Sequence, residues 1–76
     1  MNFGDAHDSM KEGAKIGRAG WNGKGMYVFY IKDWNYNQIG DAERLPFMAL
    51  KTADNKIVAW TVSQTDADAN DWEIVA

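Results

Sequence analysis

The segment 26–32, Met-Tyr-Val-Phe-Tyr-Ile-Lys, is the feature that most restricts how this chain can fold. It consists almost wholly of aromatic and β-branched residues, which favour an extended backbone, so it predicts a β-strand. A strand with one face toward water should alternate apolar and polar side chains, but both faces of this one are apolar. One face can cover a helix of the same chain, and we expect the other face to pack on a second subunit.

The remaining elements are predicted around this strand. Apolar residues recur at helical spacing over residues 3–12, which indicates a short amphipathic helix. Asp54 and Asn55 tolerate a left-handed backbone and predict a tight hairpin. Further strands are predicted at residues 15–20, 46–52, 57–62 and 72–75, and a helical turn at residues 63–70. The fold class is therefore α+β, a small antiparallel sheet packed around the N-terminal helix, with a short helical turn before the last strand.

Length and composition favour a single domain, residues 1–76, that assembles into an oligomer. A chain this short has a marginal core, which small domains usually reinforce with disulfides, a metal or a partner subunit. The sequence has no cysteine and one histidine, which removes disulfides and the usual zinc sites. We expect Trp60 and Trp72 in the core or at a subunit interface.

The charge of −3 argues against binding long nucleic acid, because that mode needs a basic face. It leaves room for a small anion held by a few local cations. The first residues lack the pattern of a signal peptide, and no apolar run reaches the ~18 residues of a membrane helix. We therefore expect a cytoplasmic protein that makes no membrane contact.

The tract 18–25, Arg-Ala-Gly-Trp-Asn-Gly-Lys-Gly, combines cations, an indole and three glycines. Glycines allow a ligand to approach the backbone, Trp21 can stack on a flat ring, and Arg18 and Lys24 can meet phosphate. These are the parts of a nucleotide-sized binding site. The same residues also fit a structural interpretation, a two-residue type I′ turn with Asn22 and Gly23 at its tip.

The tetrapeptide Ser63-Gln64-Thr65-Asp66 also has two interpretations. In the structural one, Ser63 caps a helix and Asp66 returns the hydrogen bond. In the functional one, the helix start offers free N–H groups to an anion. Gln64 and Thr65 would then contact the edge of a base or ribose hydroxyls, and Asp66 would accept from a ribose hydroxyl.

The other polar candidates favour structural roles. His7 lies on or beside the apolar stripe of the first helix and is expected to be partly buried there. Lys51 and Lys56 flank the predicted hairpin, although either could reach a phosphate. Asp68 and Asp71 are expected on a solvated helix face. The segment 33–45 is long for a connection and fits either a functional lid or a variable surface loop.

No catalytic arrangement is evident in the sequence. Cysteine is absent, His7 is far from Ser63 along the chain, no spacing selects a pair of carboxylates, and no P-loop pattern is present. We therefore expect a binding protein, not an enzyme, and one that uses no cofactor or metal.

These motifs together resemble a phage family, the small Thoeris anti-defence sponges of the second described type. The resemblance covers nearly the whole chain. It rests on the tract 18–25 and on the opening segment with Gly13 and Lys15; the second-half motifs are Pro46-Phe47, Lys51-Thr52-Ala53-Asp54, Trp60, residues 63–66 and Asp71-Trp72-Glu73. His7, Ala59 and Asp68 depart from the residue types usual at those positions in the family.

The resemblance implies a small antiparallel sheet around a helix, assembled as a homotetramer. It also implies an activity: the sequestration of cyclic nucleotide immune signals, notably glycocyclic ADP-ribose made by TIR-domain enzymes, without cleavage. Cyclic dinucleotides would be held at a separate site in some members. The ligand-binding residues expected here are Arg18, Trp21, Asn22, Gly23, Lys24, Ser63, Gln64, Thr65 and Asp66. A protein-interaction inhibitor, a small structural phage protein and a phosphodiesterase for the same signals are the competing hypotheses.

Overall fold

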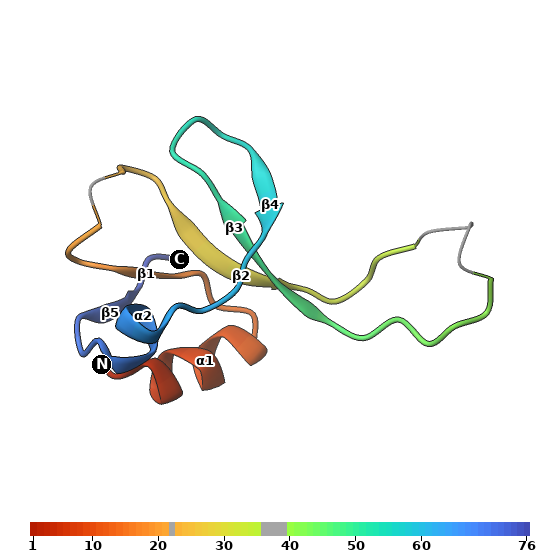
Figure 1. Ribbon diagram of the computed structural model, residues 1–76, viewed down its shortest axis with the longest axis horizontal. Coiled ribbons are helices and arrows are strands. Elements are labelled where there is room, and N and C mark those ends of the chain that lie inside the picture. The colour runs from red at the N-terminus through yellow and green to blue at the C-terminus, as the bar shows by residue number, and fades with distance from the viewer. Residues whose placement is uncertain (22, 36–39) are drawn as a thin grey trace.

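A computed structural model describes residues 1–21, 23–35 and 40–76 of the chain. It contains a five-stranded antiparallel sheet with strand order β4-β3-β2-β1-β5 and two helices (Figure 1). The elements are α1 (Phe3–Lys11), β1 (Ile16–Arg18), β2 (Tyr27–Ile31), β3 (Phe47–Lys51), β4 (Ile57–Ala59), α2 (Gln64–Asp68) and β5 (Trp72–Ile74). The predicted α+β class is confirmed.

Helix α1 matches the predicted helix to within one residue. The Asn2 side chain caps its start by accepting a hydrogen bond from the Asp5 amide at 2.8 Å. The helix is followed by Gly13, which has a φ of 106°, a backbone conformation that favours glycine over other residues. Between these ends, Ala6 and Met10 are fully buried, because their four-residue spacing places both on the face toward the sheet.

The five strands lie within the predicted ranges, but each is shorter than predicted, and β1 and β4 are shortened most. Strand β2 pairs with β3 along its whole length, from Tyr27 opposite Lys51 to Ile31 opposite Phe47. The β3–β4 hairpin turns through Asn55, which has the predicted left-handed backbone with a φ of 65°. Strand β4 ends at Ala59 instead of continuing to residue 62.

The core lies between α1 and the sheet and is centred on Trp72. Its fully buried members are Ala6, Met10, Ile16, Val28 and Trp72. The ring of Trp72 packs at 5.3 Å from that of Phe3 and at 6.2 Å from that of Trp60. Trp60 is half-buried against this cluster. The sequence therefore placed both tryptophans correctly.

His7 has the structural role that was predicted for it. It is half-buried on α1, its ring stacks on Phe3 at 5.6 Å, and its Nε2 lies 2.7 Å from the hydroxyl of Tyr30 on β2. The histidine thus joins the helix to the sheet.

The two faces of β2 have different surroundings. Val28 is buried beneath α1, and the alternation of side chains places Tyr27 and Phe29 on the opposite face. On the edge strand β4, Ile57 and Val58 are 61% and 47% exposed. Such apolar exposure is consistent with a further partner, but a second subunit stays a prediction.

Residues on both sides of the 36–39 gap extend away from the helices as a long arm between β2 and β3 (Figure 1). Its base is closed by the Trp34 indole N–H, which donates to the Leu45 carbonyl at 2.9 Å. The Trp34 ring also meets the Phe47 ring edge-on at 5.9 Å. Both hypotheses for this segment, lid and surface loop, stay open.

Candidate ligand-binding site

The glycine-rich tract forms a broad connection between two strands. Strand β1 ends at Arg18 and β2 begins at Tyr27, so residues 19–26 connect them. The type I′ turn considered from the sequence includes Asn22 and stays a prediction. Asn22 lies outside the described residues. Gly25 has a φ of 76°, a conformation that favours glycine. Gly23 packs so closely on Met26 that a Cβ there would overlap the thioether, and it would lie 3.2 Å from the Ala53 Cβ.

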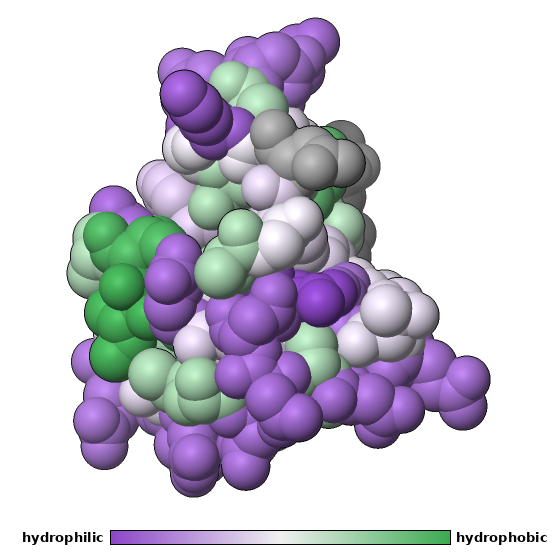
Figure 2. Space-filling view, turned by 90° about the vertical axis from the view of Figure 1, so that its left-hand side faces the viewer, coloured by the Kyte–Doolittle hydropathy of each residue, from purple (hydrophilic) through white to green (hydrophobic). Residues whose placement is uncertain are grey.

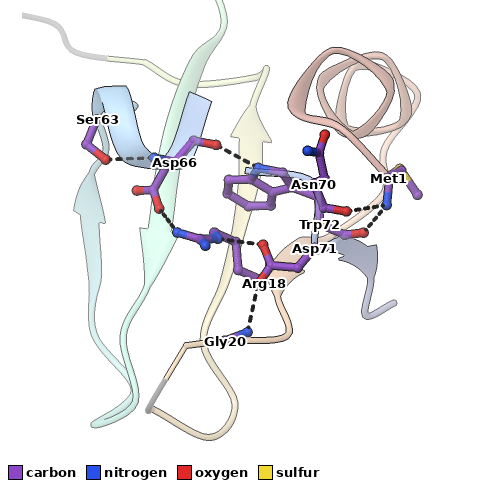
Figure 3. A network of polar contacts seen from close by, with 8 residues as sticks. All are labelled: Met1, Arg18, Gly20, Ser63, Asp66, Asn70, Asp71 and Trp72. Atoms are coloured by element: carbon purple, nitrogen blue, oxygen red, sulfur yellow. Dashed lines mark hydrogen bonds and ion pairs between the residues drawn. The ribbon is translucent and has the colours of Figure 1, made fainter. Parts of the chain in front are cut away.

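Arg18, predicted to meet phosphate, is held by two carboxylates in this structure (Figure 3). Its Nη1 donates to Asp66 Oδ1 at 2.9 Å, and its Nε donates to Asp71 Oδ1 at 2.8 Å. These hydrogen bonds, with Asp71 first and Asp66 second, raise the pKa of Arg18 above its ordinary value. Two of its five N–H donors are used in this way, so the guanidinium joins the two ends of the predicted site.

Asp71 was predicted on a solvated helix face, and this was wrong. Helix α2 ends at Asp68, and Asp71 lies just before β5, beside the end of β1. Its Oδ2 accepts a hydrogen bond from the Gly20 amide at 3.0 Å, and its carbonyl accepts from the Ala19 amide at 3.0 Å. The bond from Arg18 is the main cause that lowers the pKa of Asp71. Asp71 therefore fixes the start of the glycine-rich connection. Asp68 is exposed, as expected.

The Ser63 cap is confirmed, but the reciprocal half of the capping box is not. The Ser63 hydroxyl accepts from the Asp66 amide at 3.1 Å. The Asp66 carboxylate is directed to Arg18, and the Asp66 carbonyl accepts from the Trp72 indole N–H at 2.8 Å. The first turn of α2 is thereby attached to both β1 and the core.

Trp21 lies at the rim of this junction. Its ring meets the edge of Trp72 at 5.4 Å, with an interplanar angle of 79°, and Trp21 is half-buried. Part of the indole therefore stays open to solvent. Three further residues of the two predicted motifs are exposed, namely Lys24, Gln64 and Thr65.

The structure thus brings the two motifs to one side of the molecule, although 48 residues separate Arg18 from Asp66. Figure 2 shows this side, where hydrophilic residues alternate with smaller areas of intermediate and apolar character. The sequence missed Asp71 as a member of the junction, because Asp71 was assigned to a solvated helix face. Two signals pointed to it: its position directly before Trp72, a predicted core residue, and the Asp71-Trp72-Glu73 motif of the resemblance.

The described residues form no metal site, enclosed pocket or membrane-spanning helix. Within residues 1–21, 23–35 and 40–76, no group of three or more histidine, cysteine, aspartate or glutamate residues could hold a metal ion. This part of one chain encloses no pocket. Of its helices, none combines the length and apolar character needed to cross a bilayer.

Comparison with known proteins finds matches over nearly the whole chain. A family model described as Thoeris anti-defense 2-like domain matches residues 1–75. A curated relative, "Thoeris anti-defense 2" of Bacillus phage SP01, is 41% identical over 86 aligned residues, which cover 100% of this chain and 96% of the relative. The resemblance seen in the sequence is thereby confirmed, and the chain belongs to the Thoeris anti-defense 2-like family.

Proposed function

We propose that this protein acts as a sponge: it binds cyclic nucleotide immune signals and holds them without cleavage. Membership of the family supports a phage anti-defence role. The signal proposed is glycocyclic ADP-ribose made by TIR-domain enzymes, with cyclic dinucleotides as a second possible class. The site of action would be the cytoplasm of the infected bacterium.

The observation that carries the proposal is the Arg18–Asp66 ion pair at 2.9 Å. It unites the aromatic and glycine-rich connection with the start of α2. A nucleotide presents a flat base, ribose hydroxyls and phosphates. Trp21 offers a stacking surface, the exposed side chains of Gln64 and Thr65 offer hydrogen bonds, and Lys24 offers a positive charge.

Sequestration requires only tight binding and enough protein, since each bound signal is withdrawn by mass action. Binding pockets would form between subunits of a homo-oligomer, which we propose to be a tetramer. The exposed Ile57 and Val58 of β4 support such association, because an edge strand has unpaired backbone N–H and C=O groups and, with exposed apolar side chains, favours pairing with another chain.

Recovery of the signal tests the sponge mechanism directly. The protein is incubated with glycocyclic ADP-ribose, separated from free ligand, and heat-denatured. Release of the intact molecule, unaffected by EDTA, is expected. Time-dependent products would support a phosphodiesterase, and failure to retain the ligand would support a protein that acts by binding other chains.

Trp21→Ala and Trp34→Ala form a matched pair of variants for the same assay. Each removes one indole, but Trp34 lies at the base of the arm, where it contacts Leu45 and Phe47. Only Trp21→Ala should reduce ligand retention. Equal retention by both variants, each folded and of wild-type oligomer size, would contradict the assignment of Trp21.

A further inference from the structure

Tyr27 lies on the sheet face opposite α1, among residues that the core does not use. Its neighbour Val28 is buried beneath the helix, so Tyr27 is directed to the other face. The pairing of Tyr27 with Lys51 places both side chains on that face. Lys15 joins them, because Ile16 pairs with Val28 and the residue before Ile16 has the orientation of Tyr27.

Two ammonium groups gather on this one ring. Lys15 Nζ lies 5.0 Å from the centre of the Tyr27 ring, and Lys51 Nζ lies 5.8 Å from it. Lys51 Nζ also donates to the Gly25 carbonyl at 3.0 Å. Each contact fixes a cation without neutralising it. An ammonium has three donors, so both lysines retain N–H groups for an anion.

The proposed stacking residue packs close to the strand that follows Lys15. Gly17 lies between Lys15 and the end of β1, and a Cβ on Gly17 would lie 3.9 Å from the Trp21 ring. Gly17 follows Lys15 by two residues along the extended chain, so a Cβ on Gly17 would point to the same face as the Lys15 side chain. Trp21 therefore reaches the side of β1 to which Lys15 is directed.

Arg18 is less suited to hold phosphate than its sequence suggested. Asp66 and Asp71 both accept hydrogen bonds from its guanidinium, so the three groups together carry a net negative charge. A phosphate approaching Arg18 would meet these two carboxylates. The neighbours of Lys15 and Lys51 are instead the Tyr27 ring and, for Lys51, the Gly25 carbonyl, and neither neighbour is a carboxylate.

We propose that Lys15 and Lys51, gathered on Tyr27 beside Trp21, bind the phosphates of the captured nucleotide. The assignment of these phosphates to the signal rests on the proposed function. The anion site itself rests on the geometry of the two lysines. It recognises a diphosphate group through two fixed positive charges, while Trp21 stacks on the base.

Calorimetry with inorganic pyrophosphate and with glycocyclic ADP-ribose tests the two parts separately. Lys15→Met and Lys51→Met keep most of the aliphatic stem and remove the charge. Each should weaken both ligands about tenfold or more. Lys56→Met is the matched control, because Lys56 pairs with Asp54 on the exposed hairpin, and it should bind like wild type. Lys51→Arg should restore part of the affinity.

Amide NMR of the wild-type protein locates the anion without any variant. Pyrophosphate should shift the Gly17 and Gly25 amides and leave Gly13, at the end of α1, unchanged. Wild-type affinity for both ligands in the folded Lys15→Met and Lys51→Met variants would overturn the inference and leave the sponge proposal intact. Binding of pyrophosphate at the lysines without binding of the signal would support the anion site and contradict the proposed function. If wild type bound neither ligand, both would be overturned.

Discussion

Replacement of Trp72 by phenylalanine tests how the core supports the proposed ligand-binding surface. Trp72 is 1% exposed and is the largest fully buried side chain described. Its indole N–H donates to the Asp66 carbonyl at 2.8 Å, and its ring is the surface on which Trp21 rests. Phenylalanine keeps an aromatic ring in the core but removes the N–H group and part of the volume.

The expected loss of stability combines two effects. The hydrogen bond to Asp66 contributes about 1 kcal/mol net, and its loss leaves a partly buried carbonyl without that donor. The smaller ring leaves a cavity that costs about 1–2 kcal/mol more, less than the ~3–5 kcal/mol of a full truncation to alanine. A total of about 2–3 kcal/mol corresponds to a fall in Tm of roughly 10–20 °C for a domain of this size.

Urea unfolding followed by far-UV circular dichroism measures this loss at one fixed protomer concentration, because oligomerisation would otherwise shift the apparent stability. Trp60→Phe is the control, since Trp60 is half-buried at the margin of the same cluster. If the two variants lose equal stability, Trp72 does not have the central role that its burial and hydrogen bond indicate.

Further predictions concern the site and its connection. Trp21→Ala should weaken binding of the signal by roughly 1–3 kcal/mol with little change in Tm, measured by calorimetry and thermal unfolding; unchanged affinity would refute stacking. Lys24→Ala should lose a phosphate contact, so added salt should weaken wild-type binding more than binding by the variant. The folded state lowers the pKa of Asp71. Its ion pair with Arg18 therefore stabilises the fold at pH values above the ordinary aspartate pKa of about 4, and this stabilisation is lost as the pH falls through the lowered pKa. Acid titration should therefore show the stability gap between wild type and Asp71→Asn closing at low pH, and a gap independent of pH would contradict this. Gly25→Ala should destabilise the fold by about 1 kcal/mol, because Gly25 has a positive φ; unchanged unfolding would show that the backbone relaxes there.

The local elements were predictable because their signals lie in short stretches of sequence. The aromatic run of β2, the Ser63 cap and the left-handed Asn55 each depend on neighbouring residues and were confirmed. The end of β4 was not, since a run of apolar residues does not show where pairing with β3 stops.

The connections within the site were harder to predict, because they depend on which strands become neighbours. Asp66 and Asp71 meet Arg18 only because β5 pairs with β1, which places Trp72 opposite Arg18. No local pattern specifies that pairing. The sequence therefore indicated the proposed binding residues as two separate motifs and did not predict the ion pairs that join them.

The position of β1 between β2 and β5 also has a consequence for the order of folding during translation. Helix α1 and β1 are synthesised first, but the Trp72 ring that fills their core arrives with β5, the last element along the chain. The β2–β3–β4 meander involves only sequential neighbours, so its contacts close shorter loops and can form earlier. Until β5 emerges, α1 has an incomplete apolar partner, and a ribosome stalled before residue 72 should hold a chain that proteases cleave within α1 and β1.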